Sequence, residues 1–202
     1  MAKEVTLTPE EIEKNYNKFL KILDNTGDRS GPLKELVEHF GERFALAPAS
    51  TRVAYHACYP GGLVDHSIRV LSFALKLRTA FSLEEKISKE SVIVAALFHD
   101  LGKVGDETND YYVEQPSDWH REKLGELYKT NESLTFMPHC HRSIWLLQQF
   151  GVKLTQDEFL AIMTHDGQYI NENKSYAQKE VPLAIILHMA DYLATKAEKG
   201  VL

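Results

Sequence analysis

Apolar residues recur along most of the chain at intervals of three and four, which is the spacing of one face of an α-helix. The predicted helices span about residues 9–24, 33–44, 63–81, 89–99, 119–128, 138–150, 155–165 and 183–199. The alternating pattern of a half-buried strand is nearly absent. We therefore predict an all-α fold, in which helices pack against one another.

Several of the predicted helix starts carry residues that favour a helix N-terminus. Residues 8–11 (TPEE) offer a capping threonine, a proline and two early acids. Residues 82–85 (SLEE) and 155–158 (TQDE) have the form of capping boxes, and Pro182 stands where the start of a helix tolerates it. The remaining stretches predict loops, with a short hairpin as an alternative in the second: residues 47–62, 104–117 and 167–180.

The chain of 202 residues is long enough for one domain with a sizeable core, and it has no repeat, low-complexity tract or clear linker. Apolar residues make up 44% and charged residues 26%, which is typical of a globular protein. We expect a single domain over residues 1–202, in which N-terminal helices over residues 1–44 pack on a core of about residues 45–198.

Charge and cysteine content narrow the classes of partner and compartment. The net charge of −6 disfavours extended nucleic-acid binding. Cys58 and Cys140 form no CxxC pair and fit a reducing compartment. The N-terminal segment MAKEVTLTPEEIEKN lacks the apolar core of a signal peptide, and no segment approaches the length of a membrane span. These features predict a cytoplasmic protein without a membrane partner and leave the oligomeric state open.

The apolar run VIVAALF, residues 92–98, ends directly in His99 and Asp100. Burying either side chain is costly unless it is paired or coordinated. Other histidines and aspartates lie at helix ends or on helix faces beside apolar neighbours: His66, His139, His165, Asp166 and Asp191. A lone histidine of this kind is more often a satisfied core residue, but each of these would need its own buried partner. Imidazole and carboxylate groups together predict a site for Mn, Fe, Zn, Ni or Co.

The order of these residues resembles the signature of the HD-domain superfamily of metal-dependent phosphohydrolases. PGGLVDHSIRV (60–70) resembles its first-histidine segment and HDLGK (99–103) its central motif. Three later segments are similar to those of a bacterial and phage subgroup of HD-type hydrolases: HCHRSIWLL (139–147), AIMTHDG (161–167) and LHMADYLA (187–194). The resemblance covers about residues 45–198 and implies a single HD-domain helical bundle with a metal centre between helices.

The resemblance also implies the metal ligands. A first ion would be bound by His66, His99, Asp100 and Asp191. Members with two ions add two histidines, and His139 and His165 fit those places, with the central aspartate as the bridge. The expected cofactor is therefore a pair of divalent ions. We prefer His139 to His141 as the ligand, and His141 could instead contact a ligand from outside the metal site. Asp166 is left open as a general base, an outer hydrogen-bond acceptor or a solvated helix terminus.

Four further residues are candidates for contacts around the metals. Lys103 follows the central motif closely enough to reach a substrate phosphate, and we assign it to catalysis together with Asp100; the alternative is a solvated lysine near a helix C-terminus. Arg142 is a weaker candidate for the same contact. His56 would touch substrate or pack against a neighbouring tyrosine. His188 shares a helix face with the last aspartate and could orient it.

The favoured function is a metal-dependent phosphohydrolase, either a phosphomonoesterase or a phosphodiesterase. Metal-activated water would attack a nucleotide or another small phosphate ester. One alternative is a mixed-valent di-iron oxygenase of the HD fold, which uses the same six ligand types. Another is an HD-domain 3'-5' exoribonuclease, although the additional nucleic-acid-binding domain usual in those proteins is not visible here. A sensor that retains the metals without catalysis is disfavoured by the complete ligand set.

Overall fold

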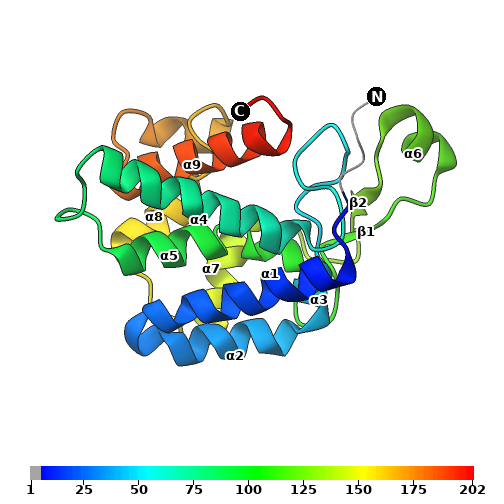
Figure 1. Ribbon diagram of the computed structural model, residues 1–202. Helices are drawn as coiled ribbons and strands as arrows, with labels where there is room; N and C mark the ends of the chain where they lie inside the picture. Colours follow the sequence, from blue (N-terminus) through cyan, green and yellow to red (C-terminus); the bar gives the residue numbers. More distant parts are fainter. Residues whose placement is uncertain (1–5) are drawn as a thin grey trace.

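The computed structural model describes residues 6–202 and shows a helical protein with one small β-ribbon (Figure 1). The α-helices are α1 (Pro9–Ile22), α2 (Ser30–Phe40), α3 (Glu42–Leu46), α4 (Gly62–Ala80), α5 (Lys89–Phe98), α6 (Asp118–Leu124), α7 (His139–Gln149), α8 (Gln156–Thr164) and α9 (Pro182–Glu198). Short 3₁₀ turns are η1 (Leu23–Asn25), η2 (Gly27–Arg29), η3 (Leu101–Val104) and η4 (Asn171–Tyr176). The predicted all-α class is confirmed. The start of the N-terminal segment discussed above, residues 1–5, lies outside the described residues.

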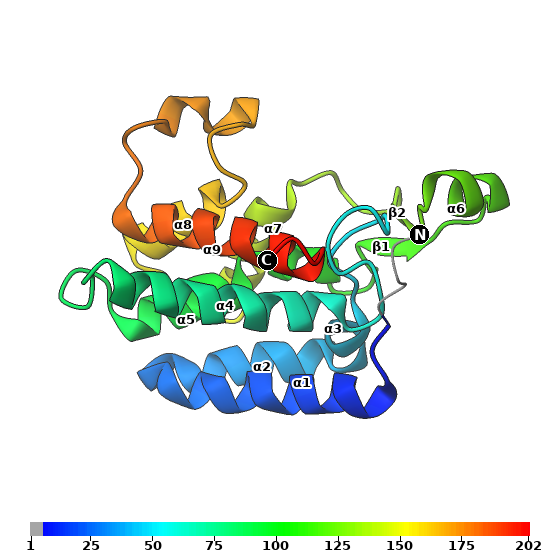
Figure 2. The ribbon, with the colours of Figure 1, turned by 45° about the horizontal axis from the view of Figure 1, so that its top comes forward.

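The helices stack in layers (Figure 2). α1 and α2 form one layer, α4 and α5 the next, and α8 and α9 a third. The long α4 packs against α1, α5 and α9, so it lies at the centre of the arrangement. Phe19 of α1 meets Phe44 and Phe98 edge-on, with ring centroids 5.1 and 5.5 Å apart, and this contact seals the first layer onto the second. Within residues 6–202, no helix is both long and apolar enough to cross a membrane.

Two of the predicted helix starts have capping boxes: the one predicted at Thr155 is confirmed, and Thr8, predicted only as a capping residue, forms another. The Thr8 hydroxyl accepts from the backbone N–H of Glu11, and the Glu11 carboxylate accepts in return from the N–H of Thr8. The same reciprocal pair caps α8 at Thr155. The box predicted at residues 82–85 is wrong, because Ser82 has a φ of +52° and starts a turn. Ser88 caps α5 instead.

Two glycines divide segments that we predicted as continuous helices. The helix predicted over residues 33–44 ends at Phe40, because Gly41 adopts a φ of +49°, and α3 follows separately. The helix predicted over 119–128 ends at Leu124, because Gly125 takes the left-handed conformation. The chain then enters strand β2 (Tyr128–Thr130), which pairs antiparallel with β1 (Tyr112–Glu114). The two strands are therefore joined by a connection that contains α6, and not by a hairpin turn within residues 104–117.

Candidate metal centre

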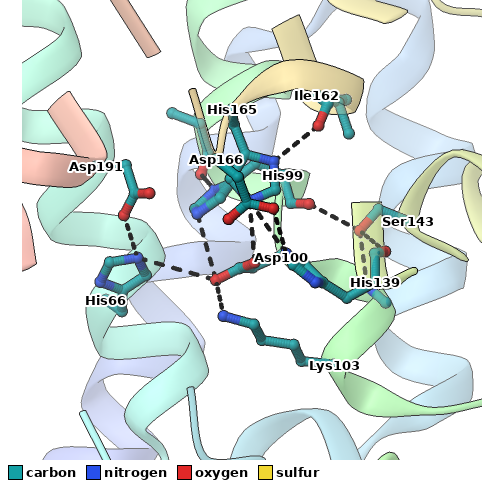
Figure 3. A network of polar contacts seen from close by, with 12 residues as sticks. His66, His99, Asp100, Lys103, His139, Ser143, Ile162, His165, Asp166 and Asp191 are labelled. Atoms are coloured by element: carbon teal, nitrogen blue, oxygen red, sulfur yellow. Dashed lines mark hydrogen bonds and ion pairs between the residues drawn. The ribbon is translucent and has the colours of Figure 1, made fainter. Parts of the chain in front are cut away.

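The six predicted metal ligands converge between five helices, with Asp100 at their centre (Figure 3). They come from different parts of the bundle: His66 from α4, His99 and Asp100 from the end of α5, His139 from the start of α7, His165 from the end of α8 and Asp191 from α9. Asp100 and His165 are only 2% and 1% exposed, and His66 and His99 are fully buried. Helix packing thus places every predicted ligand in a single cluster.

Asp100 lies between two groups of ligand atoms. Its Oδ2 is 3.4 Å from His99 Nε2 and 4.0 Å from His66 Nε2. Its Oδ1 is 3.3 Å from His139 Nε2 and 3.4 Å from His165 Nε2. On the first side, His66 Nε2 also lies 3.0 Å from Asp191 Oδ1. One carboxylate therefore faces two sets of imidazoles through its two oxygens.

Local hydrogen bonds hold two of the imidazoles in a defined tautomer. His99 Nδ1 donates to the carbonyl of Ala96 at 2.9 Å, and His165 Nδ1 donates to the carbonyl of Ile162 at 2.7 Å. A carbonyl can only accept, so Nδ1 carries a proton in each ring, and in the neutral ring Nε2 has a lone pair directed at the cluster. The helix ends thus present both rings ready for coordination.

The close approach of η3 to α7 explains why a glycine follows the central motif. A Cβ at Gly102 would lie only 2.1 Å from the backbone oxygen of His139. The N–H of Gly102 donates to Ser143 Oγ at 2.8 Å, and the same hydroxyl lies 2.8 Å from the carbonyl of His99. Gly102 and Ser143 together dock the end of α5 onto α7, which sets His139 against Asp100.

Glu198 is a member of the site that the sequence analysis missed. Its carboxylate accepts a hydrogen bond from His66 Nδ1 at 3.0 Å, and its side chain is 5% exposed. The bond leaves His66 Nε2 free to face Asp191 and Asp100, as in other histidine ligands supported by a carboxylate. A sequence signal existed, since Asp191 and Glu198 are seven residues apart and therefore share one helix face.

Unpartnered atoms show that the cluster fits a metal ion. Seven buried side-chain atoms have no hydrogen-bond partner in the described part of the chain, and four of them belong to predicted ligands: His66 Nε2, His99 Nε2, Asp100 Oδ1 and Asp191 Oδ1. Such an atom costs about 1–3 kcal/mol if nothing satisfies it. Metal–ligand bonds of about 2.1 Å place adjacent donor atoms roughly 3.0–3.4 Å apart, and most of the spacings around Asp100 fall in this range. Imidazole and carboxylate donors suit Mn, Fe, Co, Ni or Zn.

The carboxylates also make the cluster attractive to any cation. Burial disfavours a charged His66, but the carboxylates of Asp191 and Glu198 outweigh it and raise the pKa of His66 to about 10. Burial is likewise outweighed at His165, where Asp100 and Asp166 raise the pKa to about 9. Without a metal these rings hold protons, so metal binding must release them.

Lys103 lies inside the cluster and not in solvent. Its Nζ is 2.6 Å from Asp100 Oδ2, and its side chain is 10% exposed. Burial opposes the charge, but the Asp100 carboxylate more than compensates and raises the pKa of Lys103 above its usual value. Lys103 also lines a cavity of about 450 Å³, together with Tyr112 and Tyr128 of the β-ribbon. A fixed ammonium group thus connects the ligand cluster to a space of small-molecule size.

The other candidate residues take different positions. The ring of His56 lies 4.5 Å from that of His66, and its Nε2 is buried without a partner in the described residues. Burial, helped by the positive charges of His66 and Lys103, lowers the pKa of His56 to about 2, so the ring is neutral. Arg142 is buried, donates to the carbonyl of Thr135 at 2.8 Å and stacks over Tyr111.

Three neighbours of the ligands are also placed. His188 Nδ1 donates to the backbone oxygen of His165 at 2.9 Å, so it steadies His165 and not Asp191, contrary to our expectation. His141 is exposed, while His139 points into the cluster. Asp166 faces the cluster, with oxygens 3.6 Å from His139 Nε2 and 3.8 Å from His165 Nε2.

Comparison with known proteins gives a family and one relative for this chain. A sequence profile described as the HD domain matches residues 63–196, and the chain belongs to the HD-domain family. It is also similar to the dihydroneopterin 2',3'-cyclic phosphate phosphodiesterase of Methanocaldococcus jannaschii, with 37% identity over 93 residues. That match covers 41% of this chain and 36% of the relative, so the chain spans little more than a third of its length. No solved structure matches the chain.

Proposed function

We propose that this protein is a metal-dependent phosphohydrolase that acts on a nucleotide or another small phosphate ester. The observation that carries the proposal is the set of four imidazoles and two carboxylates around Asp100, with the ammonium of Lys103 held beside them. Membership of the HD-domain family and the similarity to a phosphodiesterase support it. The proposed ligands of two divalent ions are His66, His99, Asp100, His139, His165 and Asp191.

Each part of the site has a task in this proposal. Two bound divalent ions would supply a water of lowered pKa and positive charge for the phosphoryl oxygens. Asp100 holds the two sides of the cluster together, because each of its oxygens faces a different pair of histidines. Lys103 directs its ammonium to the same place and holds a phosphate oxygen there as a point charge. The protein thus orients the phosphate before reaction.

The cavity beside Lys103 is the proposed place for the organic part of the substrate. Its volume of about 450 Å³ lies within the range of small-molecule sites, roughly 300–1,000 Å³. Tyr112 and Tyr128 line it and offer aromatic surface to a base or a similar ring. His56, neutral and with an unpartnered Nε2 beside His66, is a further proposed substrate contact. Arg142, which is buried beside Tyr111, is the weaker candidate for a phosphate contact.

A substrate screen tests the proposal. Metal-free protein would be loaded separately with Mn, Fe, Co, Ni or Zn and offered phosphomonoesters, linear phosphodiesters and cyclic phosphodiesters. We expect release of phosphate or opening of a cyclic ester with at least one metal, and the name of the relative favours diesters as the first set. Oxygen uptake without phosphate-ester cleavage would overturn the proposal in favour of the di-iron oxygenase.

Replacement of Lys103 tests its assignment. We expect Lys103→Ala to lower kcat/KM by about 10- to 100-fold, since a hydrogen bond to a charged group contributes about 1.5–3 kcal/mol. Metal content measured by elemental analysis should stay unchanged. Lys153→Ala, which removes an exposed lysine, is the matched control. An unchanged kcat/KM would exclude a phosphate contact, and loss of metal would make Lys103 a structural residue.

A further inference from the structure

The His99–Asp100 pair has a structural counterpart in His165–Asp166. α5 ends at Phe98 and α8 ends at Thr164, and in each case the next residue is a histidine that caps the helix C-terminus. Each histidine donates from Nδ1 to the carbonyl three residues before it, at 2.9 and 2.7 Å. An aspartate follows each histidine. Two helix ends from different parts of the chain therefore present the same pair of donors.

Asp166 faces the second side of the cluster (Figure 3). Its Oδ2 is 3.6 Å from His139 Nε2, and its Oδ1 is 3.8 Å from His165 Nε2. These two ring nitrogens lie 3.2 Å from each other and 3.3 and 3.4 Å from Asp100 Oδ1. Asp100 Oδ1 is buried and has no hydrogen-bond partner in the described residues. One ligand atom from each of His139, His165 and Asp166 thus lies within 4.8 Å of the other two, and Asp100 Oδ1 lies beside the two ring nitrogens.

The negative charge of Asp166 at this helix end also favours a bound cation. Asp166 follows the C-terminus of α8, where the helix dipole disfavours a negative charge. In the described part of the chain, the ion-pair partners within 4.0 Å of Asp166 are His139 and His165, and neither a lysine nor an arginine is among them. A metal ion would satisfy all of these groups together.

We propose that Asp166 is a metal ligand that completes the second site together with His139, His165 and Asp100. The inference rests on the two-metal part of the proposed function. It makes the two sites equivalent in chemistry, since each has two imidazoles, its own aspartate and a share of Asp100. Asp191 is the residue of the first site that corresponds to Asp166. The two sites are then expected to take the same class of divalent cation.

Metal titration tests this assignment without reference to activity. Metal-free wild-type protein and the Asp166→Asn variant would be titrated with Mn²⁺, and bound metal would be counted by elemental analysis and by electron paramagnetic resonance. We expect two equivalents on the wild type. The variant should keep one equivalent with unchanged affinity and bind the second at least about tenfold more weakly. Asp166→Glu should restore the second equivalent in part, and Asp157→Asn, an exposed aspartate on the same helix, should match the wild type.

The outcomes separate this inference from the proposed function. Two equivalents of unchanged affinity on a folded Asp166→Asn variant would show that Asp166 is not a ligand, and the two-metal hydrolase would stand. A wild type that binds one equivalent would overturn the second site altogether. Loss of the second equivalent in a protein that cleaves no phosphate ester would support the ligand and refute the hydrolase. Melting curves of each variant show whether it is folded.

Discussion

Two buried groups of charged residues in this protein are built in opposite ways. In the first, the guanidinium of Arg29 meets both oxygens of Glu158 at 2.7 and 3.0 Å and Glu90 at 2.8 Å. Glu158 is fully buried, and its carboxylate also completes the capping box of α8. In the second, the cluster around Asp100, buried nitrogens and oxygens face one another without hydrogen-bond partners in the described residues.

The difference separates a structural role from a binding role. The protein satisfies the Arg29 network with its own residues, so this network ties η2 to α5 and α8 and needs no further group. The Asp100 cluster gathers more acceptors and lone pairs than donors, which is stable only when a cation or protons occupy it. Each place has a buried carboxylate, Glu158 in one and Asp100 in the other, and the presence of unpartnered atoms distinguishes the site.

Removal of Arg29 should give the largest change in stability. Arg29→Met leaves the carboxylate of Glu158 buried without its cation, and breaking a buried pair in this way costs about 3–5 kcal/mol. Urea unfolding measures the loss, and the number of bound metal ions should not change. Lys34→Met breaks the more exposed pair with Asp24 and should cost about 1 kcal/mol or less. Equal losses in the two variants would contradict the structural role of Arg29.

Removal of Asp100 should abolish tight metal binding and lower turnover at the cluster around this residue. Asp100→Ala takes away the carboxylate shared by both sides, so we expect the loss of tightly bound metal and a fall in kcat of at least about 10²–10³-fold, comparable to the loss of a transition-state contact. Elemental analysis and turnover of the substrate found by screening measure both. Activity must be compared with a melting curve. Near-normal turnover in this variant would rule out the proposed centre.

Glu198 should have a smaller effect that is confined to the first site. Glu198→Gln keeps a hydrogen-bond acceptor for His66 Nδ1 but removes the negative charge, so metal affinity should fall by about tenfold, as for other carboxylates that support a histidine ligand. Calorimetric titration with Mn²⁺ would resolve one weakened and one unchanged site. Glu198→Ala should weaken the first site further. If both sites weakened equally, Glu198 would act on the whole fold and not on His66.

The pH dependence of stability should show the contribution of the ion pair between Arg29 and Glu158. Burial raises the pKa of Glu158, but the hydrogen bond from Arg29 and the backbone N–H of Thr155 outweigh it, and the net pKa lies below the ordinary value of 4.5. A carboxylate with a lowered folded-state pKa contributes stability above about pH 4.5 and loses it as the pH falls through the folded value. The difference in unfolding free energy between wild type and Glu158→Gln should therefore shrink below pH 4.5. A difference that grew on acidification would have the wrong sign.

The helices and their ends were largely predictable, because the interactions that determine them lie within a few residues. The apolar spacing predicted the all-α class, and the capping threonine at Thr8 and the capping box at Thr155 are present as predicted. The same local reasoning failed where a neighbour in space decides the outcome. Gly125 ends α6 and the following strand pairs across the ribbon with residues 112–114, which no local pattern indicated.

For the site, the residue types alone indicated the chemistry of the donors, since histidine and aspartate at the ends of apolar helices need a partner wherever they are buried. How these donors are grouped depends on the packing of the helices. Glu198 reaches His66 across 132 positions of the chain, and His188 supports the backbone of His165 instead of Asp191. Such contacts depend on the angles and distances at which α4, α8 and α9 pack, and these are set by the whole core.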